Sequence, residues 1–238
     1  MSHAENYAMA LTQARQHSAE PELLPAVLVT VCVELLAVDG AGLSITENLR
    51  LPLAASNADV ATAERLQTTL GQGPCLTAAG QAALLIAGPD DMAEKWPMFH
   101  RELMAQTPFR SVLSLPLGLP TGEAFGALDL YSTQPDPSHF DALAYDGTIV
   151  AGKVSNTLLA GPSYVDGPGV SGYQWLSTDS VNERMKVWMA IGTLVAQAEI
   201  PSRDAVDLLR AYAFAHGTTL DDVAAQVVTN RLDPHTLV

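Results

Sequence analysis

Residues 184–232 read RMKVWMAIGTLVAQAEIPSRDAVDLLRAYAFAHGTTLDDVAAQVVTNRL, and three apolar stripes with helical spacing run through them. Apolar residues that recur every three and four positions form one face of an amphipathic helix. The stripes are Val187, Ala190, Ile191, Leu194, Val195 and Ala198, then Ala205, Leu208, Leu209, Tyr212 and Ala213, then Leu220, Val223, Ala224, Val227 and Val228. This stretch therefore predicts an all-α unit of three short helices.

The predicted helices are separated by residues that typically begin or end a helix. Ile200-Pro201-Ser202 ends the first helix and offers Ser202 as the N-cap of the second. His216-Gly217 fits a helix C-terminus, and Thr219 with Asp222 three residues later predicts a capping box for the third helix. Pro234 is expected to close the unit.

The spacing of small and apolar residues within these helices resembles the ANTAR module of bacterial transcription antiterminators. The matching residues are Val187, Ala190, Gly192 and Leu194, then Ala205, Leu209 and Arg210, then Leu220, Val223 and Ala224. The resemblance covers about residues 180–230 and implies an RNA-binding domain that recognises a hairpin in a nascent transcript. The side chains that it puts forward for RNA binding are Arg184, Lys186, Arg203 and Arg210, and of these Arg210 is the best single candidate. A structural alternative for Arg210 is a salt bridge to Asp207 or Asp221.

Two positions depart from the family pattern. Ile191 stands where the family usually has lysine, and Val206 stands where it usually has phenylalanine. The second change conserves an apolar side chain, whereas the first removes a charge from a surface that the family presents to RNA. The sequence therefore leaves a second reading open, a ligand-binding or dimerisation regulator that acts through protein partners and has lost RNA binding.

The charge of the chain limits its partners. The 238 residues carry a formal net charge of −14, of which residues 161–238, with five basic and nine acidic side chains, contribute −4. An acidic surface repels polyanions, so broad, non-specific nucleic-acid binding is not expected. Sequence-specific DNA binding is disfavoured because no basic recognition helix is present.

The same composition bears on location and on metals. No charged-then-apolar signal segment opens the chain, and its longest apolar run, Leu23 to Val38, is short for a membrane span, so we expect a cytoplasmic protein without membrane contact. Two cysteines without a Cys/His cluster predict no structural metal and no cofactor.

The N-terminal two thirds of the chain predicts an α+β domain with an antiparallel sheet. Helices are expected near residues 4–17, from residue 21 onward, over 58–70 and over 140–159. Leu43–Ile45 and Leu51–Ala55 alternate like two adjoining strands, and a long strand from Arg110 is expected to pair with Gly126–Tyr131 across a turn at 120–123.

Four blocks in this region resemble the GAF domain, a small-molecule sensor fold, in the version that actinobacteria fuse to ANTAR. The blocks are LQTTLGQGPC at 66–75, WPMF at 96–99, RSVLSLPL at 110–117 and FGALDLYS at 125–132. The resemblance implies an α+β GAF domain with an antiparallel sheet flanked by helices. It also implies an unknown small-molecule ligand in a mostly apolar cavity bordered by Cys75, Met92, Trp96 and Leu113.

These observations divide the chain into four parts and give each a role. They are an N-terminal helix (1–22), a GAF-like domain (23–160), a linker rich in Gly, Pro and Ser (161–180) and an ANTAR-like three-helix domain (181–238). The expected function is RNA-binding transcription antitermination, controlled by a signal at the GAF domain.

No triad, P-loop or paired catalytic carboxylates are present, so no catalytic residue and no enzyme activity are expected. Cys32 is expected to pack in the core. Cys75 lies at a helix N-terminus, which can lower a thiol pKa, although a small apolar residue at a tight turn is the simpler reading. Met185, Trp188 and Met189 form a second apolar face on the first C-terminal helix, which predicts a homodimer or packing against the GAF-like domain.

Overall fold

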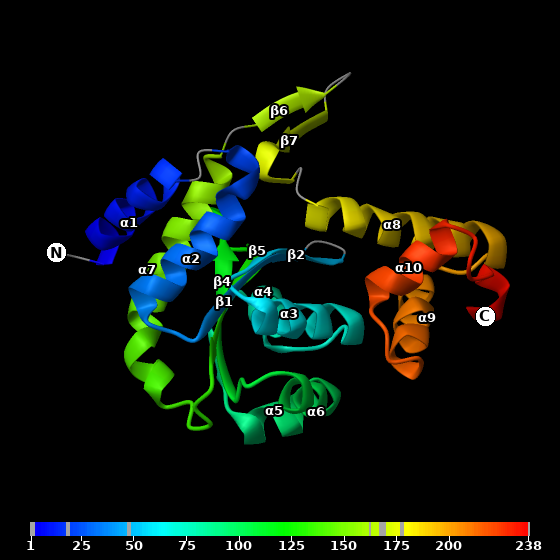
Figure 1. Ribbon diagram of the computed structural model, residues 1–238, viewed down its shortest axis with the longest axis horizontal. Helices are drawn as coiled ribbons and strands as arrows, with labels where there is room; N and C mark the ends of the chain where they lie inside the picture. The colour runs from blue at the N-terminus through cyan, green and yellow to red at the C-terminus, as the bar shows by residue number, and fades with distance from the viewer. Residues whose placement is uncertain are drawn as a thin grey trace.

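The computed structural model describes residues 3–17, 20–46, 49–161, 163–166, 170–176 and 179–237, and within them the side chains of 6–16, 20–46, 49–161, 172–176 and 185–237. An α+β domain contains most of the chain, and a helical unit follows it at the C-terminus (Figure 1). The helices of the α+β domain are α1 (His3–His17), α2 (Leu24–Leu36), α3 (Ala58–Leu70), α4 (Pro74–Gln81), α5 (Pro89–Lys95), α6 (Pro97–Gln106) and α7 (His139–Leu159). None of the described helices is both long and apolar enough to span a membrane.

Five strands form the central sheet, in the order β2-β1-β5-β4-β3, and each pairs antiparallel with its neighbours. The expected pairing of residues 43–45 with 51–55 and of the long strand with residues 126–131 is confirmed by the register. The strands are β1 (Gly40–Thr46), β2 (Arg50–Ala55), β3 (Leu85–Ala87), β4 (Ser111–Gly118) and β5 (Ala124–Ser132).

Different helices pack against the two faces of the sheet. Helices α1, α2 and α7 lie on one face, and α3 to α6 lie on the other (Figure 1). Successive side chains of a strand point to opposite faces. Leu113, Leu115 and Leu117 of β4 therefore join the core under α2 and α7, whereas Val112 joins the core under α3 and α6. The α+β architecture with helices flanking an antiparallel sheet agrees with the expectation.

The helical unit contains α8 (Asp179–Ala198), α9 (Ser202–Ala215) and α10 (Leu220–Val228), followed by a short 3-10 turn at Pro234–Leu237. The three predicted stripes meet in one core, in which Val187, Leu194, Leu209 and Val223 are fully buried. Thr219 caps α10 in a capping box with Asp222, as its sequence predicts. Ser202, however, is the first residue of α9; the N-cap is Pro201, which has no side-chain donor or acceptor to offer.

The segment expected to be a linker contains a short hairpin of β6 (Ser163–Asp166) and β7 (Val170–Tyr173) and a 3-10 turn at Gln174–Leu176. Trp175 is buried in this turn and donates its indole N–H to the carbonyl of Leu158, at 3.1 Å. One aromatic residue therefore fixes this end of the connection to α7 and to the core of the α+β domain.

Candidate functional site

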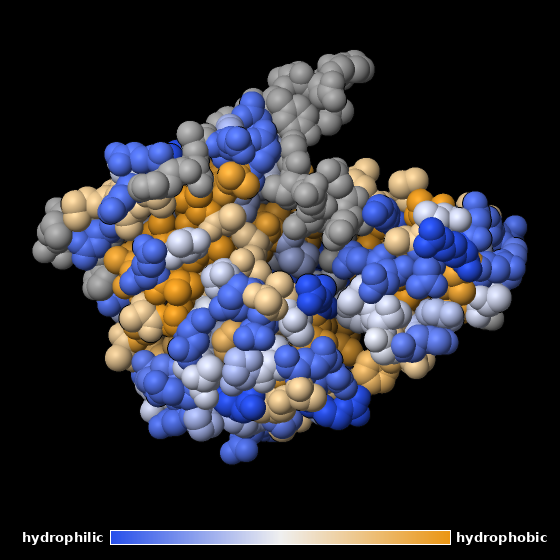
Figure 2. Space-filling model, viewed as in Figure 1, coloured by the Kyte–Doolittle hydropathy of each residue, from blue (hydrophilic) through white to orange (hydrophobic). Residues whose placement is uncertain are grey.

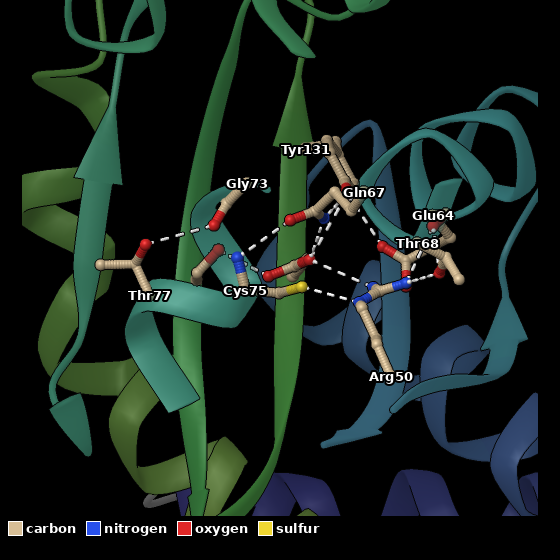
Figure 3. Close-up of polar contacts among 10 residues, drawn as sticks. Arg50, Glu64, Gln67, Thr68, Gly73, Cys75, Thr77 and Tyr131 are labelled. Carbon is tan, nitrogen blue, oxygen red and sulfur yellow. Dashed lines mark hydrogen bonds and ion pairs between the residues drawn. The ribbon is translucent and has the colours of Figure 1, made fainter. Parts of the chain in front are cut away.

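Arg50 at the start of β2 is the largest fully buried side chain of the α+β domain, and every nitrogen of its guanidinium has a partner (Figure 3). Nη2 is paired with the carboxylate of Glu64, and Nη1 donates to the Glu64 carbonyl at 2.8 Å and to Thr68 Oγ1 at 3.0 Å. Nε donates to Cys75 Sγ at 2.7 Å, and Nη2 lies 3.8 Å from Asp129 Oδ2. One cation is thus enclosed by two acidic side chains inside the fold.

Gln67 and Tyr131 join these groups into one network. The Gln67 amide donates to Asp129 Oδ2 at 2.7 Å and to the Tyr131 hydroxyl at 3.0 Å, and its carbonyl accepts the Cys75 N–H at 3.0 Å. The Tyr131 hydroxyl donates to Glu64 Oε1 at 2.8 Å. The Ser114 hydroxyl donates to Asp129 Oδ1 at 2.5 Å. We refer to Arg50, Glu64, Gln67, Thr68, Cys75, Ser114, Asp129 and Tyr131 as the buried polar network.

Local periodicity places the members of the network on one side of the sheet. Glu64, Gln67 and Thr68 lie three and four positions apart on α3 and so share one face of the helix. Asp129 and Tyr131 are two positions apart on β5 and point to the same side of the sheet. Gly42 on β1 leaves room for Glu64, because a Cβ atom there would lie only 3.0 Å from Glu64 Cγ.

Burial shifts the ionisation of the network. Burial and the neighbouring Glu64 raise the pKa of Asp129 to about 7, although Arg50 opposes them. Burial alone would lower the pKa of Arg50. Cys75, Glu64 and Asp129 together raise that pKa by more than burial lowers it, so the guanidinium stays charged. Burial also raises the pKa of the Cys75 thiol well above its usual value, in spite of Arg50. The N-terminus of α4 therefore does not activate the Cys75 thiol.

The four residues expected to border one apolar cavity do not come together. Cys75 is a member of the buried polar network, whereas Met92 and Trp96 pack in the apolar core beneath α5 and α6. Leu113 points to the opposite face of the sheet, beneath α2 and α7. The expectation assigned Leu113 to the wrong face because alternation alone does not say which side the helices α3 to α6 cover. Cys32 is buried in the core, as expected, and burial raises its pKa to about 12.

Sequence reasoning missed Arg50, Glu64, Gln67 and Asp129. A signal was present for Glu64, Gln67 and Asp129, but none for Arg50. Glu64 and Gln67 fall on the face of α3 that also carries the buried Val60 and Ala63, and Asp129 alternates with Leu128 and Leu130 in a strand that is buried on both faces.

A second site lies between the α+β domain and the helical unit. It is a groove of about 660 Å³ that includes Leu49 and Gly71 from the first and Trp188, Arg203 and Arg210 from the second. Arg203 and Arg210 are seven positions apart on α9, which places them on one face two turns apart. The structure therefore brings together two of the four residues proposed to bind RNA.

The other two basic residues are not part of this groove. Lys186 is exposed on α8, but at 100° per residue it is about 160° around the helix from Trp188. The side chain of Arg184 lies outside the described residues. Ile191 is 4% exposed and packs in the helical core, so this position is not a surface position here.

Arg210 is packed against the α+β domain. A Cβ atom on Gly71 would lie 2.7 Å from Arg210 Cζ, and Gly71 has a φ of 63°, in the left-handed region that favours glycine. Arg210 forms an ion pair of 3.7 Å with Asp207, which was one of its two expected partners. Its Nε is buried and has no hydrogen-bond partner among the described residues. Burial lowers the pKa of Arg210, against the effect of Asp207.

Comparisons with known proteins address the α+β domain. Among solved structures, the chain is similar to the GAF domain of a phosphoenolpyruvate-protein phosphotransferase from Acinetobacter, with 12% identity, 66% of this chain and 93% of that chain covered, and a TM-score of 0.45. It is also similar to the GAF domain of the enzyme of the same name from Coxiella burnetii, with 17% identity, 66% and 95% covered, and a TM-score of 0.45. No curated protein matches the chain.

A family model described as the GAF domain matches residues 20–146, which is more than half of the chain. The matched segment contains the whole five-stranded sheet and all the residues of the buried polar network. The chain belongs to the GAF domain family.

Proposed function

We propose that the protein is a GAF–ANTAR regulator of transcription antitermination, in which the C-terminal helical unit binds an RNA hairpin. Binding to one hairpin prevents a competing terminator from forming, so that transcription continues. The GAF domain senses a small molecule or another signal and controls this binding, in the cytoplasm and without catalysing a reaction.

The observation that carries the proposal is the groove that holds Arg203 and Arg210 beside Trp188. Guanidinium groups pair with phosphates in a bidentate geometry, and an aromatic ring can stack on an unpaired base of a hairpin loop. Trp188 is 42% exposed, so one of its faces is open to a ligand. The resemblance of residues 180–230 to the ANTAR module supports the same function.

The proposal is tested with the full chain, a two-hairpin RNA and the same RNA with scrambled loops. We expect specific binding that Arg210→Ala weakens about tenfold, because a hydrogen bond to a charged group contributes about 1.5–3 kcal/mol. Arg231→Ala is the matched control, since Arg231 is exposed and lies outside the groove. Equal affinity for both RNAs, or no binding at low salt, would contradict the proposal.

A second candidate function is regulation through a protein partner without RNA binding. One observation favours it: Arg210 is ion-paired with Asp207 and packed against Gly71, so its guanidinium already has contacts within the protein. It predicts that the full chain binds neither RNA and that a complex purified from cells contains a partner protein and no RNA.

A further inference from the structure

Two residues of the GAF domain hold the helical unit in place. Leu49, which directly precedes β2, is 6% exposed and belongs to the core of the helical unit rather than to that of its own domain. Thr69, near the end of α3, accepts the backbone N–H of Leu220 through Oγ1 at 3.3 Å. With Gly71, which packs on Arg210, these residues form what we call the docking surface.

The chain neighbours of these residues belong to the buried polar network. Arg50 follows Leu49, and Thr68 precedes Thr69. Arg50 Nη1 donates to Thr68 Oγ1 at 3.0 Å, so the two segments are bonded to each other inside the GAF domain. Arg50 and Thr68 face the network (Figure 3), whereas their chain neighbours Leu49 and Thr69 contact the helical unit.

We propose that the docked arrangement is an autoinhibitory contact whose strength is set by the buried polar network. A change at Arg50 or Glu64 shifts the start of β2 and the end of α3 together, and both segments carry the docking surface. Release of that surface removes Leu49 and Gly71 from the groove and exposes Arg210, while Trp188, Arg203 and Arg210 stay together on the helical unit. The coupling itself does not depend on RNA; its consequence for RNA binding rests on the proposed function.

The docking surface joins two units that have separate cores. Its contacts include the Leu49 side chain, the hydrogen bond from the Leu220 N–H to Thr69 and the Gly71–Arg210 contact, and beside them the Arg101 guanidinium lies 5.6 Å from the ring of Phe214. Figure 2 shows the helical unit set beside the GAF domain, with hydrophobic side chains visible at the junction. A contact between separately packed cores can open without unfolding either core.

The amide of Leu220 reports docking directly. It is the first residue of α10, where the backbone N–H has no acceptor within the helix, and Thr69 provides its hydrogen bond. The amide of Val223 in the same helix donates to the carbonyl of Thr219 at 3.1 Å and reports the integrity of α10 itself. Hydrogen exchange at these two amides therefore separates undocking from unfolding.

The experiment measures hydrogen exchange by NMR in the full chain and in three variants. Leu49→Ala removes the apolar contact, and Thr68→Val removes only the hydroxyl that bonds Arg50. Thr148→Val on α7 is the matched control, because the Thr148 hydroxyl also bonds a carbonyl of its own helix but lies outside the network. We expect Leu220 to exchange at least tenfold faster in Leu49→Ala and about fivefold faster in Thr68→Val, with Val223 and the control unchanged.

Two results would overturn the proposal. One is a Leu220 amide that responds to Thr68→Val no more than to Thr148→Val. The other is an equal rise at Leu220 and Val223, which reports loosening of the whole helix rather than undocking. A parallel titration with the hairpin RNA separates the two proposals: faster exchange at Leu220 with no RNA binding in any variant leaves the coupling intact and refutes the RNA function.

Discussion

At the scale of single residues, the central feature is a charged group buried with its partners. Removing a cation such as Arg50 from water costs several kcal/mol, and the surrounding hydrogen bonds offset this cost only while the set is complete. Arg50 and its neighbours Glu64 and Asp129 are each at most 2% exposed. A change to one member therefore leaves the others buried without a full set of partners.

Asp129 makes the stability of the GAF domain depend on pH. Its pKa is about 7 in the folded protein, because of burial and Glu64, and near 3.8 when it is free of these influences. A carboxyl group whose pKa is raised by folding stabilises the fold below its unfolded pKa, and this contribution is lost as pH rises through the folded pKa. The stabilising contribution of Asp129 should therefore decrease between about pH 4 and pH 7.

Asp129→Asn removes this dependence, since an amide is neutral at every pH. We expect the melting temperature of the variant to rise relative to that of the native chain as pH is raised from 5 to 8. The difference between the two proteins isolates Asp129 from other acids, because those titrate in both. A difference that stays constant over this range would show that Asp129 is ionised throughout.

At the scale of elements, α3 links the two candidate sites. One face of the helix gives Glu64, Gln67 and Thr68 to the buried polar network, and its C-terminal end gives Thr69 to the docking surface. Asn57 fixes the other end by accepting the Val60 N–H at 2.9 Å. Because Glu64, Gln67, Thr68 and Thr69 lie within two turns of each other on α3, a displacement of this end of the helix reaches both sites.

The capping box of α10 should be measurable as stability of the helical unit. Thr219 Oγ1 accepts the Asp222 N–H at 3.1 Å, and the Asp222 carboxylate accepts the Thr219 N–H at 3.3 Å. Thr219→Ala is expected to destabilise α10 by about 1 kcal/mol, since the first-turn N–H groups lose an acceptor. Urea denaturation followed by helical circular dichroism checks this. Thr193→Ala, whose hydroxyl bonds only a carbonyl of α8, should change little.

The exposed apolar face of α8 predicts self-association. Met185 and Met189 are 54% and 55% exposed, and Trp188 is 42% exposed, so docking on the GAF domain does not cover this face. We expect a homodimer through Met185 and Met189 of α8 at micromolar concentration, because burying these two side chains removes apolar surface from water. Trp188 lines the groove beside them and stays available to RNA. Hydrophobic surface also gathers over α2, on the left of Figure 2.

Analytical ultracentrifugation of Met189→Glu tests the dimer. A charge placed in a buried interface should shift the protein to the monomer. Gln197→Glu should not, because Gln197 is also exposed on α8 but points about 80° around the helix from Met189 and about 20° from Lys186. A native chain that is already monomeric at micromolar concentration would refute the prediction.

At the scale of the whole molecule, charge limits how RNA can be bound. The chain carries −14, and the helical unit with the preceding segment carries five basic and nine acidic residues. Few phosphates can therefore be neutralised. The slope of log affinity against log salt is about −0.7 per phosphate contacted on a single strand, so we expect a slope of roughly −2 to −3 for a dimer.

Filter binding at several salt concentrations measures this slope. A shallow slope with strong loop selectivity would mean that affinity rests on stacking and hydrogen bonds to bases, at about 1–3 kcal/mol per stacked base. A steep slope would mean that cationic side chains other than Arg203 and Arg210 also contact RNA phosphates.

The sequence by itself determined the class of fold of the GAF domain and most of the longer elements of the chain. Helical spacing defined α8, α9 and α10, strand alternation defined β4 and β5, and Thr219 with Asp222 defined the start of α10. These features could be predicted because each depends on residues within one or two turns of each other.

Only the tertiary structure decided where polar side chains lie and what covers the helical unit. Arg50 meets Asp129 across 79 positions of sequence, and Thr69 meets Leu220 across 151. In the sequence, nothing distinguishes Leu49 from other apolar residues at strand ends, but in the structure it packs in the core of the helical unit. Such contacts depend on how finished elements pack, and the local sequence pattern is compatible with several packings. Tertiary packing, and not the periodicity of α9, therefore placed Arg210 against Gly71.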